Sequence, residues 1–177
     1  MVGTPGTALV VLRGNSGSGK TTVARALQQR LGRDRLAVIS QDVVRREVLW
    51  AHDTPGNPAI DLMDLMARFA LDRGLSVVVE GILHPDRYGD MLRRLARDHL
   101  GRTVAYFWDL PFEETLRRHR TKTKAAEFGA AEMRDWWYGR ALVDGLQETC
   151  IGADASTADV LGVVSADCGW DTAREAR

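Results

Sequence analysis

One octet near the amino terminus, GNSGSGKT at residues 14–21, constrains this chain more than any other feature. Glycines at this spacing let backbone N–H groups turn inward around phosphate oxygens, a lysine in the place of Lys20 reaches the terminal phosphates, and the hydroxyl of Thr21 can bind Mg2+. The octet therefore predicts a loop that holds a nucleoside triphosphate. The expected nucleotide contacts are Gly14, Asn15, Ser16, Gly17, Ser18, Gly19, Lys20, Thr21 and Thr22.

The residues on either side of the octet support this interpretation. Residues 8–13 form a short apolar run typical of a buried strand, and apolar side chains recur at helical spacing from Val23 to Leu31 before Gly32 ends the pattern. The loop therefore joins a strand to the amino terminus of a helix, where unpaired N–H groups and the helix dipole favour an anion. A flexible Gly/Ser linker, the alternative, would not join two such elements so tightly.

Apolar strands and amphipathic helices alternate along the rest of the chain. Near-continuous apolar strands of this kind are typical of a parallel sheet with helices on both faces, so we expect an α/β fold. We interpret residues 1–177 as a single domain, with a short lid at about residues 118–137 and a frayed tail after about residue 166. Further strands are expected at 36–40, 76–81, 103–110 and 148–151, and helices at 43–50, 60–73, 85–100, 111–120 (with Pro111 in its first turn), 132–143 and after Ser156.

Charge and composition exclude some classes of partner. The formal net charge is zero, which argues mildly against a long nucleic-acid footprint, so we interpret nucleic acid as an unlikely partner. No apolar run is long enough to span a membrane, and the first residues do not resemble a signal peptide. Cys150 and Cys168 make no metal-binding pattern, so a reduced, cytoplasmic protein is expected. The sequence leaves monomer and homodimer open.

Two carboxylates follow predicted strands at the edge where the chemistry of such folds lies. Asp42 follows the second strand. It can cap the next helix, and it can also face the terminal phosphate and accept a proton from a substrate hydroxyl. Glu80 ends the run VVVE, where a charge needs a partner, and it is a candidate for metal or substrate binding. Asp109 closes the fourth strand, and we interpret it as a surface acid.

Basic residues gather after the fourth strand. Arg117 and Arg120 are three residues apart and share a helix face, and Arg118, Lys122 and Lys124 lie close by. They form either a solvated basic face or a lid whose arginines close over the transferring phosphate. Arg134 is a further candidate from the far side of that lid.

A second group of residues is a candidate for the acceptor pocket. Arg46 and Trp50 are four residues apart and would share a face of the helix after Asp42, where they could meet His84 and Tyr88. His84 alone is equally consistent with a structural role. Trp136 and Trp137 could stack on an acceptor or pack in the core.

The residues quoted so far resemble those of the P-loop kinases of the nucleoside-kinase-like group. The layout is similar to chloramphenicol phosphotransferase, the zeta toxins and gluconate kinase, and the resemblance runs from Ala8 to about Val164. It rests on four segments. They are GNSGSGKT, SQD at 40–42, VVVEG at 77–81 and DLPFEETLRRHRTK at 109–124.

This resemblance implies a five-stranded parallel sheet in the order 2-3-1-4-5, ATP with Mg2+ as cofactors, and phosphoryl transfer to a hydroxyl. It places Lys20, Asp42, Arg117 and Arg120 in catalytic roles. The expected acceptor is a small molecule, such as an antibiotic or a nucleoside-like compound, and an antibiotic acceptor would make the enzyme a resistance kinase. Glu80 departs from the family pattern, which has an aspartate at this strand end.

Two other functions are consistent with the same motifs. One is a kinase acting on a nucleic-acid end or a nucleotide sugar, and the other is a nucleotide-binding switch protein without catalysis. The lid arginines argue against the switch, because binding alone does not require them.

Overall fold

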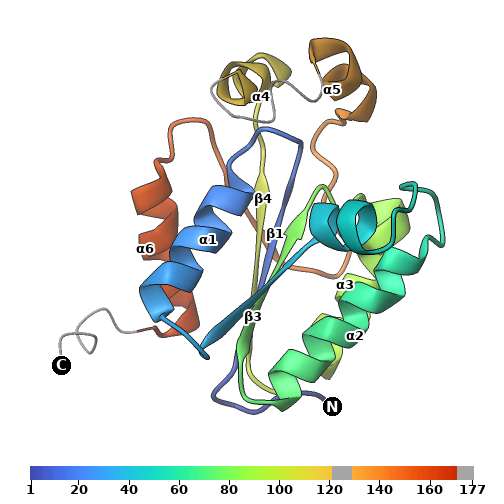
Figure 1. Cartoon of the computed structure of the whole chain (residues 1–177). Helices are drawn as coiled ribbons and strands as arrows, with labels where there is room; N and C mark the ends of the chain where they lie inside the picture. Colours follow the sequence, from blue (N-terminus) through green and yellow to red (C-terminus); the bar gives the residue numbers. More distant parts are fainter. Residues whose placement is uncertain (121–128, 171–177) are drawn as a thin grey trace.

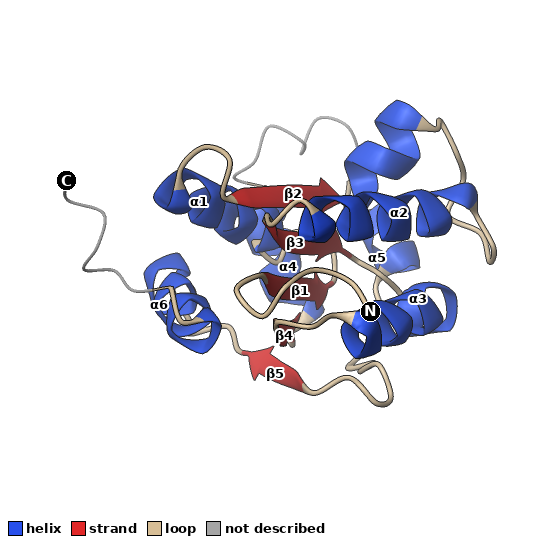
Figure 2. Ribbon diagram, turned by 90° about the horizontal axis from the view of Figure 1, so that it is seen from below, coloured by secondary structure: helices blue, strands red, loops and turns tan. Residues whose placement is uncertain are grey.

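The computed structural model describes residues 1–120 and 129–170 and consists of one sheet between two layers of helices. All five strands are parallel, and their order is β2-β3-β1-β4-β5, as the resemblance implies. The view along the sheet in Figure 2 shows α1 and α6 on one face and α2 and α3 on the other. The strands are β1 (Ala8–Gly14), β2 (Leu36–Ser40), β3 (Ser76–Gly81), β4 (Arg102–Trp108) and β5 (Glu148–Ile151).

The helices follow the strands in the alternation that the sequence predicts. Figure 1 places α4 and α5 together beyond the carboxyl ends of the strands, the end at which the phosphate loop also lies. The helices are α1 (Lys20–Leu31), the π-helix η1 (Val43–Val48), α2 (Pro58–Asp72), α3 (Pro85–Asp98), α4 (Phe112–His119), α5 (Ala130–Trp136) and α6 (Thr157–Cys168).

Two apolar cores, one on each face of the sheet, hold the layers together. β1 is buried along its whole length, since α1 and α6 cover one face and α2 and α3 cover the other. Met63 and Leu92 have no exposed surface on the α2 and α3 side, and Leu27 has none on the α1 side. Burying such a side chain stabilises the fold by about 1.5–3 kcal/mol. Because both cores pack against β1, this strand and the loop after it lie at the centre of the molecule.

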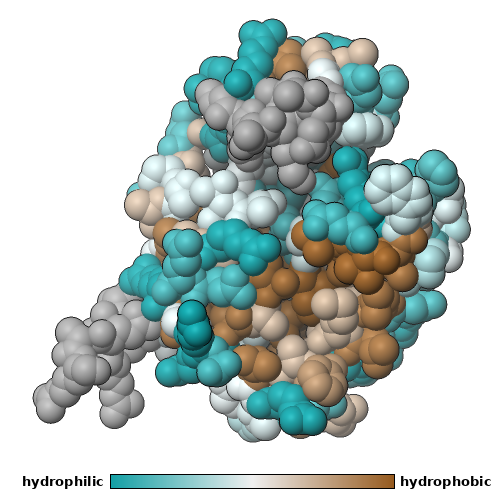
Figure 3. Space-filling view, viewed as in Figure 1, coloured by the Kyte–Doolittle hydropathy of each residue, from teal (hydrophilic) through white to brown (hydrophobic). Residues whose placement is uncertain are grey.

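The outer surface over β2 and α2 is also apolar, as Figure 3 shows between the polar ends of the molecule. In the described part of the chain no helix is long and apolar enough to cross a membrane.

Two details of the sequence interpretation, the place of Pro111 and the end of α5, are wrong, and two others are refined. The short helix predicted after Asp42 is present as a π-helix, in which the Leu49 N–H bonds to the Val44 carbonyl. Pro111 precedes α4 as its N-cap. α5 ends at Trp136, so the residues from 137 to 143 are not helical. The last helix runs two residues beyond 166, and its first turn closes with a capping box between Ser156 and Asp159.

Candidate active site

The phosphate loop lies between β1 and α1 and lines a cavity of about 520 Å³. Gly17 and Gly19 have φ values of 81° and 107°, in the region that favours glycine. A Cβ atom on Gly17 would also lie 2.5 Å from the carbonyl oxygen of Thr115, so the loop packs closely against α4. The loop conformation that the octet predicts therefore depends on both glycines.

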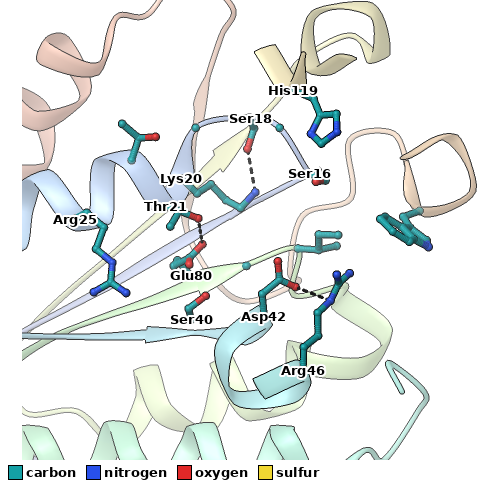
Figure 4. Close-up of a pocket in the computed structure, with 16 residues that line it drawn as sticks. Ser16, Ser18, Lys20, Thr21, Arg25, Ser40, Asp42, Arg46, Glu80 and His119 are labelled. Atoms are coloured by element: carbon teal, nitrogen blue, oxygen red, sulfur yellow. Dashed lines mark hydrogen bonds and ion pairs between the residues drawn. The ribbon is translucent and has the colours of Figure 1, made fainter. Parts of the chain in front are cut away.

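Lys20 folds back over the loop. Its Nζ donates hydrogen bonds to the carbonyl oxygens of Gly14 and Asn15, at 2.6 and 2.9 Å, and to Ser18 Oγ at 2.9 Å. The side chain is buried, yet it lines the cavity (Figure 4). An ammonium group held at this point lies where a bound phosphate chain would enter the loop.

Glu80 meets Thr21 at the floor of the cavity. The Thr21 hydroxyl donates a 3.1 Å hydrogen bond to Glu80 Oε2, and the other oxygen of this buried carboxylate, Oε1, has no hydrogen-bond partner among the described residues. An unpaired buried oxygen is costly. Because Mg2+ in nucleotide sites takes a hydroxyl, one or two carboxylates, phosphate oxygens and water, Thr21 and Glu80 fit the Mg2+ that the fold family implies.

Asp42 and Arg46 stand on the opposite side of the same cavity. The Asp42 carboxylate is 3.4 Å from Arg46 Nε and 3.6 Å from Arg45 Nη2, and it makes no capping bond to η1. Figure 4 shows Asp42 and Arg46 across the cavity from Ser16 and Lys20. The capping role considered for Asp42 is therefore wrong, and its side chain is directed toward the loop.

A second cavity of about 610 Å³ adjoins the first. Asp42, Arg46, Ile82 and Trp136 line both cavities, so the two cavities are neighbours that share these side chains. The remaining residues of the second cavity combine cationic, acidic and aromatic side chains. They are Gln41, Arg45, His52, Asp53, Thr54, His84, Arg87, Asp135, Trp137 and Tyr138.

A partly buried polar network fixes the far wall of the second cavity. Asp53 accepts hydrogen bonds from Arg87 Nη1 at 2.8 Å and from the Tyr88 hydroxyl at 3.0 Å. Gln41 donates to the same carboxylate and accepts from the Leu83 N–H at 2.9 Å. Burial raises the pKa of Tyr88 to about 12, so its hydroxyl stays protonated as a donor. Tyr88 thus supports Asp53 and does not itself line the cavity, whereas His84 lines it.

Of the two arrangements considered for the basic residues after β4, the solvated face describes Arg117 and Arg120. Arg117 is largely exposed and forms an ion pair with Glu114, and Arg120 is also exposed; neither lines the two cavities. Arg118 reaches the loop instead, with Nη1 donating to the Ser18 carbonyl at 3.0 Å, and His119 lines the first cavity. Lys122 and Lys124, within the predicted lid, lie outside the described residues.

Two further candidates also lie away from the cavities. Trp50 follows the end of η1 with a positive φ and is 90% exposed, so the shared helix face expected for Trp50 and Arg46 does not exist. Arg46 stacks on Trp136 instead, 5.5 Å from the ring centre. Arg134 lies over the ring of Phe112 at 4.0 Å. Asp109 is half-exposed and 3.9 Å from Arg140, in keeping with a surface acid.

Asn15 has a structural role that the octet does not reveal. Its amide Nδ2 donates to the Tyr138 carbonyl at 2.7 Å, and its Oδ1 accepts from the Tyr138 N–H at 3.1 Å. Tyr138 in turn donates its hydroxyl to the Ile82 carbonyl at 2.8 Å. Asn15 and Gly14 do not line the first cavity. The loop is thereby tied to one wall of the second cavity.

Arg13, the residue before Gly14, is fully buried in an ion pair that sequence analysis missed. Its Nη1 is 2.7 Å from Glu148 Oε1, and neither side chain has exposed surface. Arg13 also donates from Nε to the Leu83 carbonyl and from Nη2 to the Ala141 carbonyl. A charged residue inside an apolar strand was the available signal, but the sequence does not identify its partner.

Solved structures with the same fold include several kinases. The chain is 20% identical to the APS kinase CysC of Mycobacterium tuberculosis over 92% of this chain and 98% of that one, with a TM-score of 0.68. A gluconokinase of Sinorhizobium meliloti is 17% identical, with coverages of 94% and 93% and a TM-score of 0.63. The tunicamycin resistance protein of Deinococcus radiodurans is 20% identical, with coverages of 93% and 97% and a TM-score of 0.62.

A search of curated proteins finds no match. The structural neighbours establish the fold, and the five-stranded order and the loop are those of P-loop kinases. The family model described as "AAA domain" (AAA_33) matches residues 9–138, which is most of the chain, and the protein therefore belongs to this family.

Proposed function

We propose that this protein is an ATP-dependent, Mg2+-requiring kinase that transfers the terminal phosphoryl group to a hydroxyl of a small molecule. The observation that carries the proposal is that the two cavities adjoin each other and share Asp42 and Arg46 in their linings. One cavity has the lining expected of a phosphate site, and the other offers a polar and aromatic compartment for an acceptor. A switch protein that only binds nucleotide has no use for the second compartment.

In the first compartment the loop and Lys20 bind the phosphate chain. Thr21 and Glu80 hold Mg2+, which neutralises charge on the phosphates when it is bound. Phosphoryl transfer requires little covalent chemistry from a protein, so positioning and electrostatic stabilisation supply most of the rate. Lys20 thus stabilises negative charge that develops during transfer.

At the junction of the compartments Asp42 accepts a hydrogen bond from the acceptor hydroxyl and orients its oxygen toward the phosphorus. Arg46 and Arg45 hold the carboxylate in place. Arg46 also lines both cavities, and it is therefore better placed than Arg117 or Arg120 to contact the transferred group. His84, Trp136, Trp137 and Tyr138 surround the body of the acceptor.

The aromatic side chains favour an acceptor with a flat or ring-shaped body. A nucleoside-like compound or an antibiotic fits this description, and a neighbour of the same fold is a tunicamycin resistance protein. The proposal is tested by incubating the purified chain with ATP, Mg2+ and a panel of hydroxylated metabolites and antibiotics, and by measuring ADP release together with the mass of the product. ADP release without a phosphorylated product from any compound would argue for a nucleotide hydrolase instead.

Replacing Asp42 with asparagine should lower turnover by about 100-fold, the lower part of the range for loss of a positioned acid–base group. Asparagine keeps the size of the side chain but removes the charged acceptor. The affinity for ATP, measured by calorimetry, should not change. Glu47→Gln, which removes an exposed carboxylate from the same π-helix, is the matched control and should retain full activity. Equal turnover of Asp42→Asn and the wild type would rule out this role.

Replacing Glu80 with glutamine should weaken Mg2+-dependent binding of a non-hydrolysable ATP analogue by about 10- to 100-fold, the range for groups that support a metal ion. Binding measured without Mg2+ should stay the same, because the loop contacts remain. Calorimetric titrations with and without Mg2+ separate the two effects. Glu113→Gln, at an exposed site on α4, is the control. An equal loss of affinity under both conditions would show that Glu80 supports the loop and not the metal.

A further inference from the structure

An apolar stripe on α2 faces largely outward. Leu65 is 64% exposed, Phe69 60% and Met66 39%, and Leu62 beside them is partly buried against the core. These residues recur at the spacing i, i+3, i+4 and i+7, so they form one face of the helix, while Met63 and Ala67 belong to the opposite, core-facing side. Figure 3 shows this apolar region on the near face of the molecule. Exposed apolar side chains gathered on one face are typical of an interaction site.

The stripe adjoins the β2 edge of the sheet, where Gln28 of α1 donates to the Leu36 carbonyl and the backbone groups of Val38 have no neighbouring strand among the described residues. β2 is the outermost strand, and it pairs only with β3 among the described strands. The Arg35 carbonyl bonds to Ser76 in β3, so by the alternation along a strand the backbone groups of Val38 face outward. β2 contains neither proline nor a charged residue, the usual devices that protect an edge from pairing.

We propose that a second copy of this chain covers the stripe and the edge, with the two α2 helices antiparallel about a two-fold axis. The choice of a second copy as the partner rests on the charges near the two ends of α2. Asp61 and Arg73 are both exposed and flank the stripe. A two-fold axis beside position 67 places Asp61 of each copy opposite Arg73 of the other, and the same axis pairs Leu65 with Phe69. The surface is therefore complementary to itself, as such an interface requires.

The same two-fold symmetry also brings the two β2 edges together. A two-fold axis perpendicular to the sheet brings the two β2 edges together antiparallel, and it keeps both α2 helices on one face of the joined sheet. A stable interface buries about 800 Å² on each partner. In the proposed arrangement the stripe and the edge both contribute to the interface, and both become covered at once.

Charge reversal tests the arrangement directly. Sedimentation equilibrium of the full chain should show a dimer. Asp61→Arg and Arg73→Asp should each raise the dimer dissociation constant by about tenfold, since each reversal creates two repulsive pairs. The double variant Asp61→Arg/Arg73→Asp should return the constant to near the wild-type value. Asp154→Arg, an exposed site after β5, is the control for charge alone and should leave the constant unchanged.

Three outcomes would overturn the proposal. They are a wild type that stays monomeric at high micromolar concentration, a dimer that is insensitive to both reversals, and a double variant no tighter than the singles. Leu65→Ser provides a second measurement, and it should yield a monomer with an unchanged melting temperature when compared at low concentration. None of these results depends on the kinase proposal, because neither cavity is lined by these residues.

Discussion

Replacing Lys20 with alanine should reduce phosphoryl transfer by about 100- to 1,000-fold, the loss expected when one group that stabilises transition-state charge is removed. Lys20 is the cation that the loop itself holds, and three oxygen atoms of the loop fix its Nζ in the first cavity. The measurement is product formation at saturating ATP with whichever acceptor the panel identifies. The effect should appear mainly in kcat, since the negative charge grows as the phosphoryl group moves.

Two comparisons make this result interpretable. Arg30→Ala removes a cation from the last turn of the same helix and should retain wild-type activity. Circular dichroism and thermal melting establish whether Lys20→Ala is folded, because the substitution leaves the Gly14 and Asn15 carbonyls without this donor. A folded Lys20→Ala variant that transfers phosphate at the wild-type rate would refute the assignment of the loop as the donor site.

Replacing Arg13 with methionine should lower the free energy of unfolding by about 3–5 kcal/mol, the cost of leaving one member of a buried ion pair without its partner. Among the described residues, Glu148 would then keep a single hydrogen bond, from the Val143 N–H, to its buried carboxylate. The Leu83 and Ala141 carbonyls would also lose their donor. Urea denaturation measures the change.

The double variant Arg13→Met/Glu148→Leu should recover much of this loss, since no isolated charge remains in the core. Arg68→Met is the matched control. It removes an arginine whose partners, Asp64 and Asp98, are partly exposed, and it should cost only about 1 kcal/mol or less. Additive losses in the double variant would mean that the pair contributes through packing and not through charge.

The sheet was predictable because its strands are short, apolar and separated by helices. Such strands favour a parallel sheet, while the order 2-3-1-4-5 came from the resemblance and is confirmed. The predicted strand bounds agree with those in the structure within a few residues, because each apolar run has clear ends. The π-helix was not predictable, because the periodicity of VVRREV does not distinguish a bond to the fifth residue from one to the fourth.

The loop side of the site was easier to predict than the acceptor side. The octet fixes the positions of Lys20 and Thr21 within one continuous segment. The acceptor side is assembled from four segments, and helical spacing alone placed Trp50 beside Arg46, although η1 ends before Trp50. The contact of Arg118 with Ser18 links residues 100 positions apart, and neighbouring arginines on a helix give no indication of which one turns inward.

The pair of hydrogen bonds between Asn15 and Tyr138 has a consequence for how two substrates would be bound. Tyr138 lines the second cavity and donates its hydroxyl to the Ile82 carbonyl just after β3, so any shift of the loop on phosphate binding would be transmitted to that wall. Phosphate binding would then change the affinity for the acceptor, and thermodynamic linkage would make the effect equal in both directions. The side-chain amide of a single asparagine is thus the contact through which the two substrates would influence each other.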